Sequence, residues 1–399
     1  MARIAVDAMG GDLAPRSPVA GALLALAELG SEHTVILVGR TRIIEDELHR
    51  LEAESIAGFA AARARISIVE APDVIEMTDR PTAAIRGKPH SSMVVGLKLH
   101  AADNADAFVS SGNTGAQMAS SVFLLKLHHG LTRPAIAAMI PTLKHPVVLV
   151  DAGANVDCSA EELVQFARLG SVYAEDILMR PEPAIGLLSN GEEPEKGNAS
   201  VKEAHKLLSA AGLNFVGNVE GRDILTAGSS RGALVTATEG RAEPVVGLLN
   251  IGEEVIKGSE VIKRAGELLR TVASQGHLNY FGNVEGDDIF KGTADVVVCD
   301  GFVGNVLLKF YESVPSLIFS MLASAGIKQE LIAQTFRGFD YSDYGGAPLL
   351  GVKGVSIISH GSSSPHAMKN AIQVAVRAVE SRMNDHIGRR LGHAAVTSA

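Results

Sequence analysis

Six apolar runs of strand length each end in a loop of small polar residues and glycine. They lie at Ile4–Asp12, Ala107–Ala116, Val147–Cys158, Val245–Glu254, Val296–Asn305 and Val355–Ser363. Short runs rich in Val and Ile and bounded by Gly predict buried parallel strands. Segments with helical spacing, such as Pro18–Leu29 and Glu161–Leu178, separate several of these runs. This alternation predicts an α/β fold with a mainly parallel sheet.

The loops that follow these runs predict an anion-binding site. Loops after parallel strands gather at the carboxyl edge of the sheet, where open α/β folds bind ligands. Their Gly, Ser, Asn and Thr residues offer backbone N–H groups and short polar side chains, which suit an anion. No loop reads as a nucleotide P-loop or as a G-x-G-x-x-G dinucleotide motif. Ordinary strand-to-helix turns use the same residues, so a single loop does not establish the site.

Composition narrows the class of protein. The net charge of −9 over 399 residues argues against a general nucleic-acid binder, which needs a basic surface. The two cysteines, Cys158 and Cys299, are too few for a disulfide framework and have no neighbouring ligand in sequence, so we expect a reducing compartment and no metal site. We expect no signal peptide and no membrane span, because the first strand starts at once and no apolar run is long enough.

One strand–loop–helix–strand unit occurs twice. Gly186–Asn198 returns as Gly247–Ser259, and Leu213–Ile224 returns as Leu278–Ile289. Near-identical strands compete for one position in a parallel sheet, because each position is defined by its two neighbours. The second copy continues directly into the strand at Val296, whereas the first continues into a Gly-, Ser- and Thr-rich stretch. We therefore expect the second copy to occupy the sheet and the first to be peripheral or poorly ordered.

The domain organisation follows from these patterns. We expect one α/β domain over residues 1–385, with the duplicated unit at 186–246 and 247–290 and a disordered tail at 386–399. A helical hairpin is expected at about 309–336, where few charges interrupt a broad apolar face. That face fits a dimer interface, and it also fits a surface that contacts lipid.

Eight motifs, taken together and in this order, resemble a known family. They are VDAMGGDLAP, SSGNTGA, RPAIAAMIPT, VDAGANVDC, LLNIGEE, FGNVEG, DVVVCDGFVGN and GVKGVSIISHGSS. The combination resembles the bacterial phosphate acyltransferases (PlsX), the acyl-ACP:phosphate transacylases of phospholipid synthesis. The resemblance spans Arg3 to about Arg377, and it departs from the family where the unit is doubled, since family chains are shorter by roughly one copy.

The resemblance implies a three-layer α/β/α fold like those of isopropylmalate dehydrogenase and phosphotransacetylase. It implies a homodimer that uses no metal or other cofactor and converts acyl-ACP (ACP, acyl carrier protein) and inorganic phosphate into acyl phosphate and free ACP. The acyl phosphate would pass to a membrane glycerol-3-phosphate acyltransferase, so the protein is expected in the cytoplasm with peripheral membrane association. Three alternatives stay open: a CoA-dependent phosphotransacetylase, a decarboxylating dehydrogenase, and a folded but inactive homologue.

Candidate site residues follow from the chemistry of phosphate attacking a thioester, which needs anion donors and a cation. The phosphate- and substrate-binding candidates are Asp7, Gly10, Gly11, Ser111, Gly112, Asn113, Thr114, Asp151, Asn155, Asn250 and Asn305. The catalytic candidates are Lys257, His360, Asn283 and Asp300, and the carrier-protein candidates are Arg86, Lys88, Arg133 and Lys144. Carboxylates repel phosphate, so the strand-end aspartates are expected to bind loop amides or to orient a cation. No Ser-His-Asp or Cys-His pair stands out, which favours direct displacement.

Overall fold

The computed structural model describes two compact units. The described residues are 1–54, 58–140, 147–155, 158–179, 185–191, 199–211, 213, 215–219, 246–252, 280–284, 296–298 and 345–396, with single positions between 306 and 327. Unit 1 comprises Met1–His128 and Ser342–His386, and unit 2 comprises His129–Tyr341 and Ile387–Ala399. The predicted hairpin at 309–336 and the Gly-, Ser- and Thr-rich stretch after the first copy lie outside the described residues.

Unit 1 is built on a mainly parallel sheet. Its strands are β1 (Arg3–Asp7), β2 (Thr34–Gly39), β3 (Ile66–Glu70), β4 (Ala107–Ser110), β12 (Ala347–Leu350) and β13 (Val355–Ile358). They lie in the order β3-β2-β1-β4-β13-β12, and β12 alone runs antiparallel to its neighbour β13. Ile4 pairs with Val35 of β2 on one side and with Ala107 of β4 on the other. The chain leaves β1 toward β2 and β3 and returns to β4 on the opposite side, which places a topological switch point between β1 and β4.

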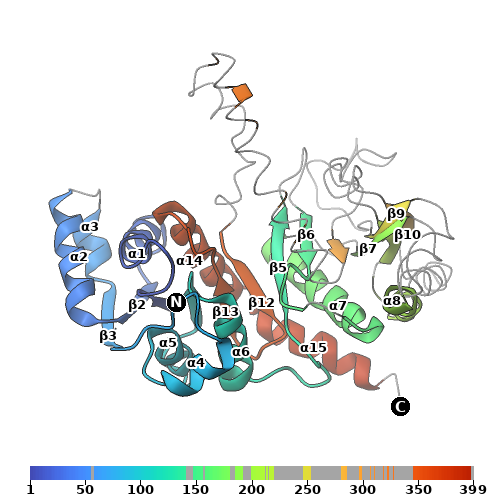
Figure 1. Cartoon of the computed structure of the whole chain (residues 1–399), viewed down its shortest axis with the longest axis horizontal. Helices are drawn as coiled ribbons and strands as arrows, with labels where there is room; N and C mark the ends of the chain where they lie inside the picture. The colour runs from blue at the N-terminus through green and yellow to red at the C-terminus, as the bar shows by residue number, and fades with distance from the viewer. Residues whose placement is uncertain are drawn as a thin grey trace. The chain divides into compact units, whose positions relative to one another are not determined.

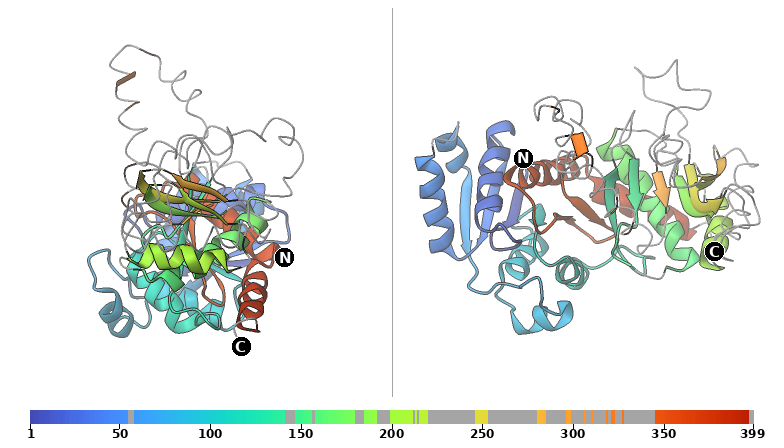
Figure 2. Two further views of the ribbon diagram at one scale, coloured as in Figure 1. Left: turned by 90° about the vertical axis from the view of Figure 1, so that its right-hand side faces the viewer. Right: turned by 45° about the horizontal axis from the view of Figure 1, so that its top comes forward.

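Helices cover both faces of this sheet and complete three layers. They are α1 (Arg16–Glu28), α2 (Thr41–Ala53), α3 (Phe59–Arg63), α4 (Pro81–Gly87), α5 (Ser92–Ala101), α6 (Thr114–Leu125) and α14 (Pro365–Glu380). The α1–α14 pair lies on one face and the α4–α5–α6 group on the other (Figures 1 and 2). Glycine permits close approach in both layers, since a Cβ on Gly21 would meet Met368 and one on Gly96 would meet Phe108. The predicted α/β/α architecture is confirmed here.

Unit 2 also carries a mainly parallel set of strands. They are β5 (Ala135–Ile140), β6 (Val147–Val150), β7 (Ile185–Gly191), β8 (Phe215–Val219), β9 (Val246–Gly252), β10 (Tyr280–Val284) and β11 (Val296–Val298). The order is β5-β6-β11-β9-β7-β8, with β10 on β9, and only β5 and β6 pair antiparallel. Helix α7 (Ala160–Ile177) packs against β6, β7 and β11, and helix α8 (Ala199–Ser209) packs against α7.

Both copies of the duplicated unit contribute strands to this sheet. The second copy supplies β9, which pairs with β11, and β10, which pairs with β9. The first copy supplies β7 and β8, together with α8, whose Val201, Ala204 and Leu208 are fully or almost fully buried. The prediction of a peripheral first copy is therefore wrong. The reason is that these three residues recur at helical spacing and form an apolar face that α7 covers.

Residues 386–396 are helical, whereas a disordered tail was predicted for 386–399, of which 397–399 lie outside the described residues. Helix α15 spans Met383–Val396, and its Ile387 and Leu391 are buried. Arg390 forms two hydrogen bonds of 2.8 Å to the Glu175 carboxylate of α7. The buried residues Ile387 and Leu391, four positions apart, and the ion pair of Arg390 with Glu175 hold this segment. The sequence does not reveal the ion pair, because Glu175 is far away in the chain. Among the described residues, no helix is long and apolar enough to cross a membrane.

Candidate active site

Three loops of unit 1 meet at the switch point. They follow β1, β4 and β13, which are neighbours in the sheet, and they lead into α1, α6 and α14. Because these strands pair parallel, the three loops lie at the same carboxyl edge of the sheet, as predicted from the sequence. Backbone bonds join them, because Ser359 N donates to Ser110 O at 2.8 Å and Asp12 N donates to Gly361 O at 2.8 Å.

Asp7 organises the loops after β1 and β4. Its buried carboxylate accepts hydrogen bonds from Met9 N at 3.1 Å and from Ser110 Oγ at 2.8 Å. Burial raises the pKa of the Asp7 carboxyl, while hydrogen bonds from Ser92, Ser110 and Met9 oppose the rise. The prediction that Asp7 binds loop amides is confirmed. Ser110, which the sequence reasoning missed, also accepts a hydrogen bond from Gly112 N at 3.0 Å. The Gly112 amide is therefore used in a hydrogen bond within the loop.

Glycines let the loops approach one another. Gly11 adopts a φ of +94°, and a Cβ there would lie 2.6 Å from Ser111 Oγ and 2.9 Å from the carbonyl oxygen of Gly361. A Cβ on Gly10 would lie 2.5 Å from Asp7 Oδ2. Ser111 Oγ donates to Gly10 O at 2.8 Å. The predicted pair Gly10–Gly11 thus provides the close contact between loops, and the Ser111 hydroxyl is used to fix it.

Asn113 joins the start of α6 to a distant turn. Its Oδ1 accepts from Ala116 N at 3.0 Å, which caps the helix. Its Nδ2 lies 3.1–3.3 Å from the carbonyl oxygens of Glu76, Met77 and Asp79. Because these contacts use both ends of the amide, the described role of Asn113 is structural, and phosphate binding by its side chain stays a prediction. Thr114 follows as the exposed first residue of α6.

His360 stands exposed on the loop after β13. Ser362 N, which can only donate, lies 3.3 Å from His360 Nδ1, and Ser362 Oγ lies 2.7 Å from the same atom. Nδ1 is therefore an acceptor, so the neutral ring carries its proton on Nε2. Ser362 was missed because a serine two residues after a histidine is an ordinary loop pattern. Ser364 caps α14 by accepting from Ala367 N at 3.2 Å.

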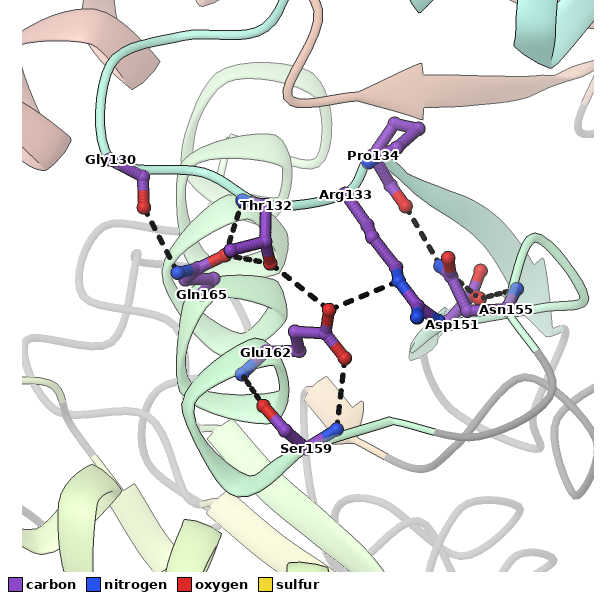
Figure 3. A network of polar contacts seen from close by, with 9 residues as sticks. All are labelled: Gly130, Thr132, Arg133, Pro134, Asp151, Asn155, Ser159, Glu162 and Gln165. Carbon is purple, nitrogen blue, oxygen red and sulfur yellow. Dashed lines mark hydrogen bonds and ion pairs between the residues drawn. The ribbon is translucent and has the colours of Figure 1, made fainter.

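Asp151 and Asn155 form a separate network in unit 2 (Figure 3). Asp151 accepts from Ile136 N at 2.9 Å, from Ala154 N at 3.1 Å and from Asn155 N at 2.7 Å. Asn155 Nδ2 donates to Asp151 Oδ2 at 2.9 Å and to Pro134 O at 2.8 Å. Burial raises the pKa of the Asp151 carboxyl, and these bonds oppose the rise. The predicted amide-binding role of Asp151 is confirmed.

Two of the predicted basic residues are committed to carboxylates. Arg133 Nε lies 3.1 Å from Glu162 Oε1, and Glu162 also completes a capping box with Ser159 at the start of α7 (Figure 3). Lys88 Nζ bonds to Asp79 Oδ2 in unit 1. Arg86 is exposed in the last turn of α4. A carrier-binding role would therefore compete with the ion pairs of Lys88 and Arg133, whereas Arg86 forms no ion pair with the described residues of unit 1.

The described residues of unit 1 thus bring one predicted set together, and other predicted residues belong to unit 2. The set brought together at the switch point is Asp7, Gly10, Gly11, Ser111, Gly112, Asn113, Thr114 and His360. Asp151, Asn155 and Arg133 belong to unit 2. Lys257, Asp300, Asn305 and Lys144, and the side chains of Asn250 in β9 and Asn283 in β10, lie outside the described residues.

One group in unit 1 has the composition of a metal site. Single ligand atoms of Glu32, His33 and Glu380 all lie within 4.8 Å of one another. However, Ala2 N donates to His33 Nδ1 at 3.2 Å, which places the proton of the neutral ring on Nε2. Nε2 faces Glu32 Oε1 at 3.2 Å and Glu380 Oε1 at 3.3 Å, so it donates to carboxylates. This tautomer leaves Nε2 without a lone pair for a metal.

Comparison with known proteins places the chain in a family. The family model described as "Fatty acid synthesis protein" matches residues 2–231 and 232–386, in two segments that meet between the duplicated copies. "Phosphate acyltransferase" of Desulforamulus reducens is 40% identical over 395 residues, covering 95% of this chain and 94% of its own. "Phosphate acyltransferase" of Chlorobaculum parvum is 37% identical over 407 residues, covering 98% and 99%.

Solved structures support the fold. The EutD phosphotransacetylase from Staphylococcus aureus superposes with a TM-score of 0.53 at 13% identity, covering 95% of this chain and 94% of that chain. A branched-chain phosphotransacylase from Enterococcus faecalis V583 gives a TM-score of 0.50 at 15% identity, with 95% and 99% covered. These neighbours confirm the predicted phosphotransacetylase-like architecture. On its sequence identity to curated relatives over nearly its whole length, the chain belongs to the phosphate acyltransferase family and is an acyltransferase.

Proposed function

We propose that this protein transfers the acyl group of long-chain acyl-ACP to inorganic phosphate and releases acyl phosphate and free ACP. The observation that carries the proposal is the start of α6 at the switch point. Asn113 caps only the amide of Ala116, and the amides of Thr114 and Gly115 have no hydrogen-bond partner among the described residues. Free first-turn amides at the positive end of a 12-residue helix bind anions.

The surroundings of these amides suit phosphate as the nucleophile. Asp7 lies beside the same loops, and its carboxylate is occupied by hydrogen bonds from Met9 N and Ser110 Oγ, which offset its charge. A phosphate oxygen held at α6 attacks the thioester carbonyl carbon and forms the new C–O bond. The C–S bond then breaks, and the thiolate of the carrier takes up a proton. The attacking hydrogen phosphate gives up this proton as the acyl phosphate forms. We propose that Nε2–H of His360 donates a hydrogen bond to the departing sulfur, because the Ser362 contacts keep the ring proton on that nitrogen.

The test is phosphate-dependent release of free thiol from defined donors. Palmitoyl-ACP with phosphate should give thiol and acyl phosphate, and acetyl-CoA should give far less. Turnover of acetyl-CoA in preference to palmitoyl-ACP would identify a CoA-dependent phosphotransacetylase instead. Absence of turnover with either donor in a folded preparation would indicate the inactive homologue and overturn the proposal.

The expected partners follow from this reaction. ACP is acidic and this chain carries a net charge of −9, so docking requires a local basic surface. Arg86 is the proposed centre of that surface, since it is exposed while Lys88 and Arg133 are paired. We also propose a homodimer in the cytoplasm and peripheral association with the membrane, where a glycerol-3-phosphate acyltransferase would consume the acyl phosphate. Sedimentation without lipid tests the homodimer, and co-sedimentation with lipid vesicles tests association with the membrane.

A further inference from the structure

A short turn beside the active-site loops holds an exposed methionine. Glu76–Asp79 is closed by Asp79 N donating to Glu76 O at 3.1 Å and by Glu76 N donating to Asp79 Oδ2 at 2.8 Å. Met77 in this turn is 48% exposed. A single exposed apolar side chain is common on protein surfaces and by itself means little. Met77 differs from such scattered residues in two respects: its turn is held by hydrogen bonds, and it lies beside the loop that carries His360.

The turn is fixed from two elements. Asn113 Nδ2 reaches three carbonyl oxygens of the turn at 3.1–3.3 Å, while Asn113 Oδ1 caps α6. Lys88, just after α4, bonds to the Asp79 carboxylate. The same Asn113 that begins the anion-binding helix therefore also sets the position of Met77. Two candidate ligand-binding residues of the sequence analysis, Asn113 and Lys88, serve in the described structure to hold this turn.

Met77 lies against the loop that carries His360. A Cβ built on Gly361 would be 3.3 Å from Met77 Cε and 3.2 Å from Asp12 Oδ2. Gly361 follows His360 directly, and its carbonyl oxygen accepts from Asp12 N of the loop after β1. Leu13, the next residue of that loop, is also exposed, at 49%. Exposed apolar atoms thus border the polar loops at which phosphate is proposed to bind.

We propose that the Met77 turn contacts the acyl chain of the donor beyond its first four carbons and so contributes to chain-length preference. This inference rests on the proposed function. Phosphate and the acidic carrier are polar and do not need apolar groups beside this site. The acyl chain is apolar, and it starts at the carbonyl that phosphate attacks, so it must leave the site past such groups. A thioether is flexible and polarizable, which suits contact with chains that differ in conformation.

The experiment compares Met77→Gln with Met77→Leu on palmitoyl-ACP and butyryl-ACP at saturating phosphate. Gln keeps the length of the side chain but adds a polar amide, and Leu keeps an apolar volume. Met77→Gln should raise KM for palmitoyl-ACP about tenfold and change KM for butyryl-ACP less than about twofold, because mainly the long chain loses apolar contact. Met77→Leu should keep KM for palmitoyl-ACP at the wild-type value. Ile43→Gln is the control, since Ile43 is also exposed and lies on α2 of the same unit.

The outcomes separate this inference from the proposed function. If the wild-type protein releases no thiol from either acyl-ACP, the proposed function fails. If the wild type is active but Met77→Gln changes both KM values equally, or neither, the Met77 inference is overturned. Circular dichroism and thermal unfolding of each variant identify a loss of fold, and in that case Met77→Ala on the same two donors decides the question.

Discussion

At the residue scale, Gly11 is a position in the candidate site where the backbone itself requires glycine. Its φ of +94° strains any other L-residue, and a Cβ would also press on the backbone oxygen of Gly361 at 2.9 Å. We predict that Gly11→Ala lowers the free energy of unfolding by roughly 3 kcal/mol and raises KM for phosphate, because the loops after β1 and β13 must separate. Chemical denaturation and steady-state kinetics measure the two effects.

Gly58 gives the matched control for that substitution. It has a φ of +76°, yet an added Cβ would find only Ala27 Cβ, at 3.8 Å. Gly58→Ala should therefore cost about 1 kcal/mol of backbone strain and leave KM for phosphate unchanged. Equal effects of the two variants on KM would show that the loop contact at Gly11 has no part in phosphate binding.

Asp7 gives a prediction about pH at the same scale. An acid with a raised pKa in the folded protein binds its proton more tightly there than in the unfolded chain. Its stabilising contribution is therefore complete below about pH 3.9 and is lost as pH rises toward the folded pKa. Asp7→Asn removes this titration, so the free energy of unfolding of wild type relative to the variant should fall with pH by up to about 1.4 kcal/mol per unit. Parallel curves between acidic and neutral pH would contradict a buried, raised pKa.

At the element scale, Asn113 couples helix α6 to the Met77 turn. We predict that Asn113→Ala lowers stability by more than the roughly 1 kcal/mol typical of a lost cap, because three carbonyl oxygens also lose their donor. Hydrogen exchange at the amides of Glu76 and Asp79 should become faster. Ser364→Ala, which removes only the cap of α14, should leave exchange in that turn unchanged. Equal exchange in both variants would mean that the turn is held without Asn113.

At the scale of the whole molecule, the surface charge bears on the carrier. We predict that Arg86→Glu raises KM for palmitoyl-ACP about fivefold at low salt and leaves KM for phosphate unchanged, because a rim charge acts mainly on encounter. The difference should shrink at high salt, where exposed charges are screened. Arg42→Glu, at another exposed arginine of unit 1, is the control. If both reversals raise KM equally, the effect comes from net charge and Arg86 is not the docking centre.

The duplication allows a deletion that tests the whole fold. Removing 186–246 joins Ile185 to Gly247 and brings the second copy behind α7. The buried α8 positions Val201, Ala204 and Leu208 are then replaced by Ile262, Ala265 and Leu269, so the apolar face is retained. We predict a soluble protein with cooperative thermal unfolding and activity on palmitoyl-ACP at least equal to that of the full chain. An insoluble product would show that both copies are required for folding.

What the sequence determined about this protein is mainly local. Apolar runs ending in glycine-rich loops correctly located β1, β4, β6, β9, β11 and β13, because a buried parallel strand needs only a short run of Val and Ile. The order of motifs identified the family. The sequence did not reveal β5, which pairs antiparallel with β6, or β12, which pairs antiparallel with β13. It also did not reveal the helical end at α15, because Arg390 there bonds to Glu175, which is far away in the chain.

Only the tertiary structure decided what each polar side chain does. Asn113 reaches Glu76–Asp79 and Arg133 reaches Glu162, partners that no spacing in the sequence connects. The same holds for Ser110, whose hydroxyl serves Asp7 and the loop after β4. Residue type shows which hydrogen bonds a side chain can form, but its actual partner is set by which strands lie next to each other. That adjacency arises from burial of the whole sheet, and so it is a property of the folded chain.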